Sequence, residues 1–244
     1  MKKLLLLLLP LLLGGCGVEE PVTETNPKTE VVNEYELEAR DGIAYLKGTE
    51  TPYTGKQIGW HENGKKEGEI NWRNGMLHGL FESWYDNGTN RAKGNWKEKK
   101  KEGLWVYWYE SGQRKQEVTF KDGKQNGLLK EWFENGQISQ EGNWKDDKQN
   151  GSIVFWYENG QKEEEGTYIM DKTDGLYITW YKNGQKSAES NYNDDKHHGQ
   201  SVRWHENGQK SYEANFKEGK PVEGSQKFWN SKGEPVDSEE EAFK

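Results

Sequence analysis

The stretch Trp156-Tyr157-Glu158-Asn159-Gly160 recurs every 24 residues through most of this 244-residue chain. A second glycine stands nine residues before each closing glycine, as Gly151 stands before Gly160. Seven copies are regular, and an eighth, looser copy follows around Trp229. Self-similarity at a fixed period of about 20–50 residues is typical of a solenoid or array. The row of closing glycines is Gly64, Gly88, Gly112, Gly136, Gly160, Gly184 and Gly208, and the tryptophan row is Trp60, Trp84, Trp108, Trp132, Trp156, Trp180 and Trp204.

The composition alone would suggest disorder, because 31% of the residues are hydrophobic and 31% are charged. The 12 Trp and 12 Tyr argue against disorder, since many of them recur at the fixed period. Each short unit can therefore bury a few large rings. The repeats predict one elongated body without a central core, in which each copy contacts only its neighbours.

Residues 1–15 have the layout of a secretory signal, with Lys2 and Lys3 before the apolar run Leu4–Leu13. That run of 10 residues is too short to span a bilayer, which takes about 20 helical residues. Leu13-Gly14-Gly15-Cys16 resembles the lipobox of bacterial lipoproteins, which implies cleavage before Cys16 and acylation of Cys16. Residues 16–34 are then the lipidated cysteine and a flexible tether. Gly17 favours the outer membrane if the organism is Gram-negative.

Within one unit, residues 151–157 have the β-branched and aromatic chemistry of a strand. Asn159-Gly160 predicts a type I′ turn, and residues 161–168 return as a second strand. The polar residues 145–150 are expected to be a loop that joins one hairpin to the next. The fold class predicted is all-β, an elongated single-sheet antiparallel meander of hairpin repeats.

Both ends of the array depart from the period. Residues 35–54 predict an N-terminal capping hairpin, with Asp41-Gly42 as its turn. The array itself is expected over residues 55–233. Residues 234–244 are acidic, with Glu239-Glu240-Glu241, and predict a disordered tail.

Two aromatic rows run through the units, and adjacent residues of a strand face opposite sides of a sheet. The tryptophan row is invariant in the regular copies, so it is interpreted as the buried, structural row. The next row has His61 and His205 at its ends, and it is either an aromatic ladder with polar caps or a contact surface. If it is a contact surface, the candidate partner-binding residues are Tyr85, Tyr109, Phe133, Tyr157 and Tyr181.

The Gly-x4-Trp-Tyr-x2-Gly unit and its return strand resemble the variant MORN repeat (membrane occupation and recognition nexus). The lead-in Arg40-Asp41-Gly42-Ile43-Ala44-Tyr45 also resembles the start of bacterial proteins of the YwqK antitoxin group. The resemblance covers about residues 35–233. It implies a β-hairpin array used for protein or lipid contact, and it implies no catalytic residues.

The folded part contains no glycine-rich phosphate loop, no serine elbow and no cysteine. The sequence therefore predicts a protein that is not an enzyme and has no cofactor. His197 and His198 lie beside Asp194 and Asp195, a group that is interpreted as a solvated turn rather than a metal site. The net charge is −8, and removal of Lys2 and Lys3 leaves −10, which disfavours nucleic acid and anionic lipid as partners.

Three functions remain open at this point. The first is a lipid-anchored scaffold at the cell envelope that binds a partner protein. The second is an antitoxin or immunity protein that neutralises a toxin. The third is cell-wall or glycan binding, because exposed aromatic rows can stack on sugar rings. The sequence does not name the partner.

Overall fold

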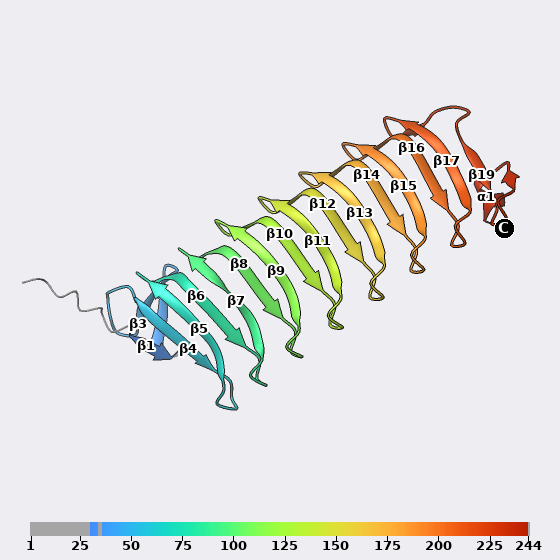
Figure 1. Cartoon of the computed structure of the whole chain (residues 1–244). Helices are drawn as coiled ribbons and strands as arrows, with labels where there is room; N and C mark the ends of the chain where they lie inside the picture. The colour runs from blue at the N-terminus through green and yellow to red at the C-terminus, as the bar shows by residue number, and fades with distance from the viewer. Residues whose placement is uncertain (1–29, 34–35, 244) are drawn as a thin grey trace, which may run out of the picture.

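The computed structural model describes residues 30–33 and 36–243, and most of them form one long, open sheet of consecutive hairpins (Figure 1). The sheet has 18 strands. From β4 to β17 every strand pairs antiparallel with its neighbours in the chain, which confirms the predicted fold class. These strands are β4 (Gly55–Trp60), β5 (Lys66–Arg73), β6 (Met76–Trp84), β7 (Asn90–Lys97), β8 (Lys100–Trp108), β9 (Arg114–Lys121), β10 (Lys124–Trp132), β11 (Ile138–Lys145), β12 (Lys148–Trp156), β13 (Lys162–Ile169), β14 (Lys172–Trp180), β15 (Lys186–Asn193), β16 (Lys196–Trp204) and β17 (Lys210–Lys217).

The positions of the two turn types differ from the prediction. Gly160 has φ +82°, but Asn159 has no positive φ, so this is not a type I′ turn. Instead Gly160 donates its N–H to the carbonyl of Tyr157, and the ladder shifts register after Phe155. This is a longer turn that ends in a left-handed glycine bulge.

The two-residue turns with two positive φ values lie in the segments that were expected to be loops. Asp146 has φ 51° and Asp147 has φ 68°, and Lys145 pairs directly with Lys148. Aspartate tolerates the left-handed region because its short side chain can bond locally. The residues from 145 to 150 are therefore mostly strand, with only two residues in the turn.

The N-terminal edge of the sheet is covered by β1 (Val31–Asn33), which pairs parallel with β4. The last residues assigned to the tether are therefore strand, and β1–β4 is a parallel pair in an otherwise antiparallel sheet. The Tyr53 hydroxyl donates to the Glu30 carbonyl at 3.0 Å and so holds β1 in place. A separate hairpin, β2 (Leu37–Arg40) and β3 (Ile43–Leu46), is bonded to the turn after β5 through Ala44 N–H and the Gly75 carbonyl.

The C-terminal end is also covered. Residues 234–244 were expected to be disordered, but β20 (Pro235–Val236) pairs with β19 (Lys227–Trp229), and α1 (Glu239–Ala242) follows. A short strand, β18 (Lys220–Pro221), links the array to this cap. Ser238 caps α1 by accepting the N–H of Glu241, and Ala242 is buried. The acidic residues lie in the first helical turn, where the helix dipole favours them.

The core lies on one face of the sheet, which is called the packed face here. Its centre is Trp105, Val118 and Leu129, and Ile153 is fully buried in the next unit. Glycines make room for two of these side chains: a Cβ on Gly94 would clash with the ring of Trp105, and one on Gly142, which pairs with Ile153, would lie 2.7 Å from Ile153 Cγ1. Alternation of large and small residues across neighbouring strands lets a single sheet bury side chains without a second layer.

Candidate functional site

The other side of the sheet, called the tryptophan face here, carries the invariant tryptophan row. The row was predicted to be buried, and the structure contradicts this: Trp60 is 52% exposed, and the other six are half-buried. The reason is period two, since Trp108 lies three residues after the buried Trp105 and so faces the opposite way. A leucine row on the same face is exposed too: Leu80 is 37% exposed, Leu104 53%, Leu128 40% and Leu176 43%.

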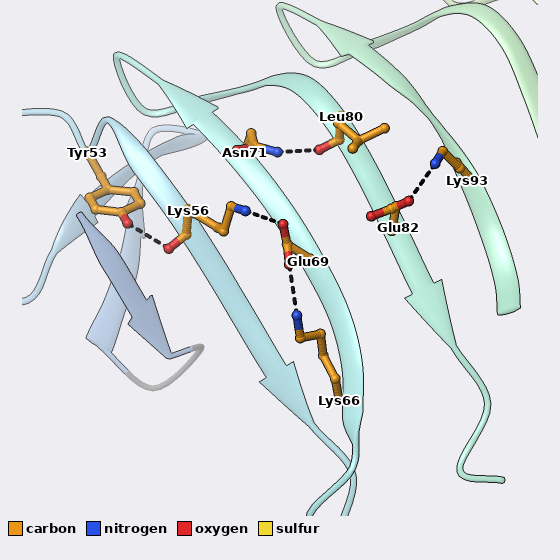
Figure 2. Close-up of polar contacts among 8 residues, drawn as sticks. All are labelled: Tyr53, Lys56, Lys66, Glu69, Asn71, Leu80, Glu82 and Lys93. Atoms are coloured by element: carbon orange, nitrogen blue, oxygen red, sulfur yellow. Dashed lines mark hydrogen bonds and ion pairs between the residues drawn. The ribbon is translucent and has the colours of Figure 1, made fainter. Parts of the chain in front are cut away.

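Ion pairs lie on the tryptophan face, some between neighbouring strands and one along β5 (Figure 2). Glu69 is bonded to Lys56 and lies 3.0 Å from Lys66 Nζ, and Glu82 lies 2.7 Å from Lys93 Nζ. Burial raises the pKa of the Glu69 carboxyl, but the hydrogen bonds from Lys56 and Lys66 outweigh it and leave the pKa below its usual value. The face therefore combines exposed apolar side chains with charges that are already paired.

Lysines also lie over some of the tryptophan rings. Lys66 Nζ lies 5.4 Å from the centroid of Trp84, and Lys162 Nζ lies 5.5 Å from that of Trp180. A cation within about 6 Å of a ring face is attracted by the ring quadrupole. These lysines come from the unit before the ring that they cover, so they join units as well as shield the rings.

The tyrosines among the candidate partner-binding residues form hydrogen bonds to the next unit of the chain. The Tyr157 hydroxyl donates to the carbonyl of Trp180 at 2.8 Å, and His61 and His205 make the same link through Nε2. Burial raises the pKa of the Tyr157 hydroxyl, with Glu163 adding to the effect. The hydroxyls thus tie each unit to the next, while the rings stay half-buried, and partner binding by this row remains a prediction. The other hydroxyl links are Tyr85 to Trp108, Tyr109 to Trp132 and Tyr181 to Trp204.

Asparagine and aspartate side chains make two further ladders, one along each long edge. At one edge, Asn159 Nδ2 donates to the carbonyl of Lys182 in the next unit at 2.7 Å. At the other edge, Asp171 Oδ1 accepts the N–H of Gln149 in the preceding unit at 2.7 Å. Both contacts recur in several other units, so side chains at the turns connect neighbours that the strands already pair.

The histidine and aspartate group is not a solvated turn throughout. His197 lies between the rings of Tyr192 and Phe216, with centroids 4.3 Å and 4.9 Å away. Burial lowers its pKa, and the Arg203 charge adds to this. Asp194 pairs with Lys172 at 2.5 Å, and Asp195 accepts the N–H of Thr173. No cluster of three or more metal-binding side chains was found among residues 30–33 and 36–243.

The proposed lipidation residue, Cys16, lies outside the described residues. Within the part of the chain that the structure describes, no helix is long and apolar enough to cross a membrane. The exposed leucine row was missed by sequence reasoning. Its signal was the 24-residue recurrence of leucine four residues before Trp84, Trp108, Trp132 and Trp180.

Comparison with known protein families identifies the repeat. The MORN repeat variant matches seven segments, which together cover more than half of the chain, and no curated protein matches it. The segments are residues 53–74, 77–98, 101–122, 125–146, 149–170, 173–194 and 198–218. Each of the seven carries one turn glycine of the row Gly64 to Gly208 with positive φ. The chain therefore belongs to the family of proteins built from the MORN repeat variant.

Proposed function

We propose that this protein is a non-catalytic scaffold, anchored by lipid at Cys16 to the cell envelope, that binds a partner protein along its tryptophan face. The observation that carries the proposal is the exposed leucine row. Leu80, Leu104 and Leu128 come from three successive units, and within residues 30–33 and 36–243 no second layer of sheet lies above them. Asn95 and Thr119 lie between these leucines on the intervening strands, so the face offers a partner several equivalent apolar contacts at equal steps.

The charges on this face favour a protein over nucleic acid or an anionic lipid surface. Glu69, Glu82 and Glu141 each pair with a lysine of the same face, so the strip has little free positive charge to offer phosphates. Two strands separate equivalent leucines, which spaces them by about 10 Å. A partner that contacts several of them gains from multivalency, so each single contact needs to contribute little.

A toxin is one kind of protein partner, and the YwqK resemblance supports an antitoxin role as the narrower alternative. Glycan binding is the second alternative, supported by the half-exposed tryptophan rings beside Lys and Glu side chains that can bond hydroxyl groups. Retention on purified cell wall would favour the glycan role, whereas neutralisation of a toxin encoded beside this protein would favour the antitoxin role.

Site-specific photo-crosslinking in the intact envelope tests the proposal. A photoreactive residue is placed at Leu80, Leu104 or Leu128, and, as matched controls, at Asp86, Glu110 or Glu134 on the turn edge of the same units. We expect a single protein adduct from the leucine positions and none from the edge positions. Adducts only from the edge, or no protein adduct from any leucine position, would contradict the proposal.

A further inference from the structure

A hollow of about 470 Å³ opens on the packed side where the third and fourth regular units meet. Its aromatic walls are Tyr107 and Tyr109 from the third unit and Phe133 from the fourth, and Trp132, whose ring belongs to the tryptophan face, also borders it. Glu131 also lines it. Because Glu131 pairs with Gln116, as Tyr107 does, its side chain lies on the same face as the core residues around Tyr107.

This hollow is particular to one place in the array. The position of Glu131 is Tyr107 in the unit before and Phe155 in the unit after. A carboxylate is thus set between two aromatic positions in a row that holds no other acid. The remaining members of that row are Gly59, Ser83, Thr179 and Arg203.

The Glu131 carboxylate has no cationic partner in the part of the chain that the structure describes. Its Oε1 accepts a hydrogen bond from Gln116 Nε2 at 2.5 Å, and within residues 30–33 and 36–243 no lysine or arginine nitrogen forms an ion pair with it. Glu117 and Glu141, on the tryptophan face of the neighbouring strands, are both paired with cations. Glu131 therefore offers a negative charge to a ligand.

Two other charged groups lie at the hollow. Lys115 lines it, and its Nζ lies 5.5 Å over the ring of Tyr109. Lys115 is exposed, so its ammonium can move into solvent when a cation enters. Glu134 lies close enough to Tyr109 that, after burial, its charge contributes to raising the pKa of that hydroxyl, and Glu131 adds to the effect. Lys101 lies beside the hollow and donates to the Tyr107 hydroxyl, but it is not among the lining residues.

The packed face already holds cations with aromatic rings at two other places. Lys101 Nζ lies 4.5 Å from the Trp105 ring, 5.0 Å from that of Phe120, and donates to the Tyr107 hydroxyl at 2.6 Å. Arg203 lies 5.0 Å over the ring of Tyr212 and pairs with Glu239 at 3.0 Å. The second arrangement is a guanidinium between a ring and a carboxylate. The hollow at Glu131 has the ring and the carboxylate without the guanidinium.

We propose that this hollow is a binding site for an arginine side chain presented by a partner. The Glu131 carboxylate, the Gln116 Oε1 and the Ser139 hydroxyl all line the hollow or its rim and can accept from a planar fork of N–H donors. A quaternary ammonium has no N–H to donate and would leave these acceptors unsatisfied. The site lies on the packed face, so it stands or falls independently of the tryptophan-face proposal.

The test is an NMR titration of the full chain in detergent micelles, with the side-chain amide N–H groups of Gln116, which bond Glu131 in the hollow, as the reporter. The probe is N-acetyl-arginine amide, and the comparison probes are N-acetyl-citrulline amide, which is the neutral isostere, and N-acetyl-lysine amide. We expect a saturable shift with the arginine probe and at least a tenfold weaker response with either comparison probe. A saturable shift that is equal for citrulline or lysine overturns the assignment to a guanidinium, and no saturable shift with arginine overturns the site.

Two variants complete the test. Glu131→Gln keeps the shape of the side chain and should weaken binding of the arginine probe at least tenfold. Glu141→Gln, on the tryptophan face of the next strand, should leave that binding unchanged. Unchanged binding in Glu131→Gln, in a variant that keeps the indole spectrum of the parent, would overturn the proposal. Glu131→Asp keeps the carboxylate, so it should bind the arginine probe more tightly than Glu131→Gln does.

Discussion

The hydroxyl of Tyr157 lies 2.8 Å from the carbonyl oxygen of Trp180, 23 residues further along the chain. This bond joins the turn end of one unit to the last strand residue of the next, and it recurs through the tyrosine row. The row that was expected to face a partner therefore also holds neighbouring units together. The recurrence of aromatic residues in that row from unit to unit follows from the array itself, because each unit is stable only through its neighbours.

Tyr157→Phe removes one of these bonds and leaves the ring. We expect the free energy of unfolding to fall by about 1 kcal/mol, the typical net contribution of such a bond. Phe133 provides the reverse experiment, because it occupies the same row without a hydroxyl. Phe133→Tyr should raise the urea midpoint or leave it unchanged. A Tyr157→Phe chain with the parent's midpoint would show that the bond contributes nothing.

Gly142→Ala tests the packed face. The new Cβ would lie 2.7 Å from Ile153 Cγ1, and Ile153 is fully buried, so the core must shift. Overpacking of this kind typically costs about 1–3 kcal/mol. Gly68→Ala is the matched control: it is also a strand glycine without positive φ, but its Cβ would meet nothing closer than 3.7 Å. Chemical denaturation should separate the two variants. Equal stability of both would contradict the packing described here.

His197 predicts a pH dependence. Its pKa is lowered from 6.5 by burial between Tyr192 and Phe216, with Arg203 adding to the shift. Below pH 6.5 the unfolded chain therefore binds the proton more readily than the folded chain, and stability falls as the pH decreases toward the folded-state pKa. Gln125 and Gln149 occupy the equivalent position in two other units, so His197→Gln introduces a residue that the array already contains there. This variant should lose the part of the acid sensitivity that His197 causes. His198→Gln is the control and should keep it. A parent and a His197→Gln chain with the same pH profile of thermal midpoints would refute this.

Cys16→Ser tests the anchor. If Cys16 carries the lipid, the serine variant should leave the membrane fraction or remain as the unprocessed precursor. The measurement is partition between detergent and aqueous phases, together with the mass of the N-terminal peptide. Membrane partition identical to that of the parent would rule out the anchor.

The fold was largely predictable because the same pattern of turn glycines and strand residues recurs every 24 residues. Gly160 and its equivalents, together with the strand chemistry around Ile153, predict hairpins at a fixed period, and the sheet follows. What period alone did not predict was which face would be covered. Trp156 has the larger and invariant side chain, yet Ile153 is buried, because Gly142 on the neighbouring strand makes room for it.

The turn chemistry was predicted less well. Asn-Gly is the strongest hairpin signal in general, but Asn159 uses its side chain to bond Gln161 and Lys182, which holds the longer turn. The two-residue turn falls at Asp146-Asp147 instead. The C-terminal cap was missed because an acidic tail resembles disorder, whereas Ser238 and Ala242 fix it as a helix against the last strands.

The sequence could have drawn attention to the hollow at Glu131, because Glu131 is the one acid in its row. Its aromatic walls could not be predicted, since they depend on how two units meet at the turn end. Sequence spacing shows which residues share a row. It does not show the depth of a hollow that forms between the side chains of neighbouring rows.

The central claim is that one 24-residue period is an exchangeable unit, two strands long, in an open array. Deletion of residues 127–150 removes one period and joins equivalent positions, so the chain should fold with one unit fewer. Small-angle X-ray scattering should then show a maximum dimension shorter by about 10 Å, the width of two strands. Deletion of residues 127–138 removes about one strand. Because every later strand would then run in the opposite direction, this deletion should unfold the array. A 24-residue deletion that unfolds the protein, or that leaves its length unchanged, would contradict the account.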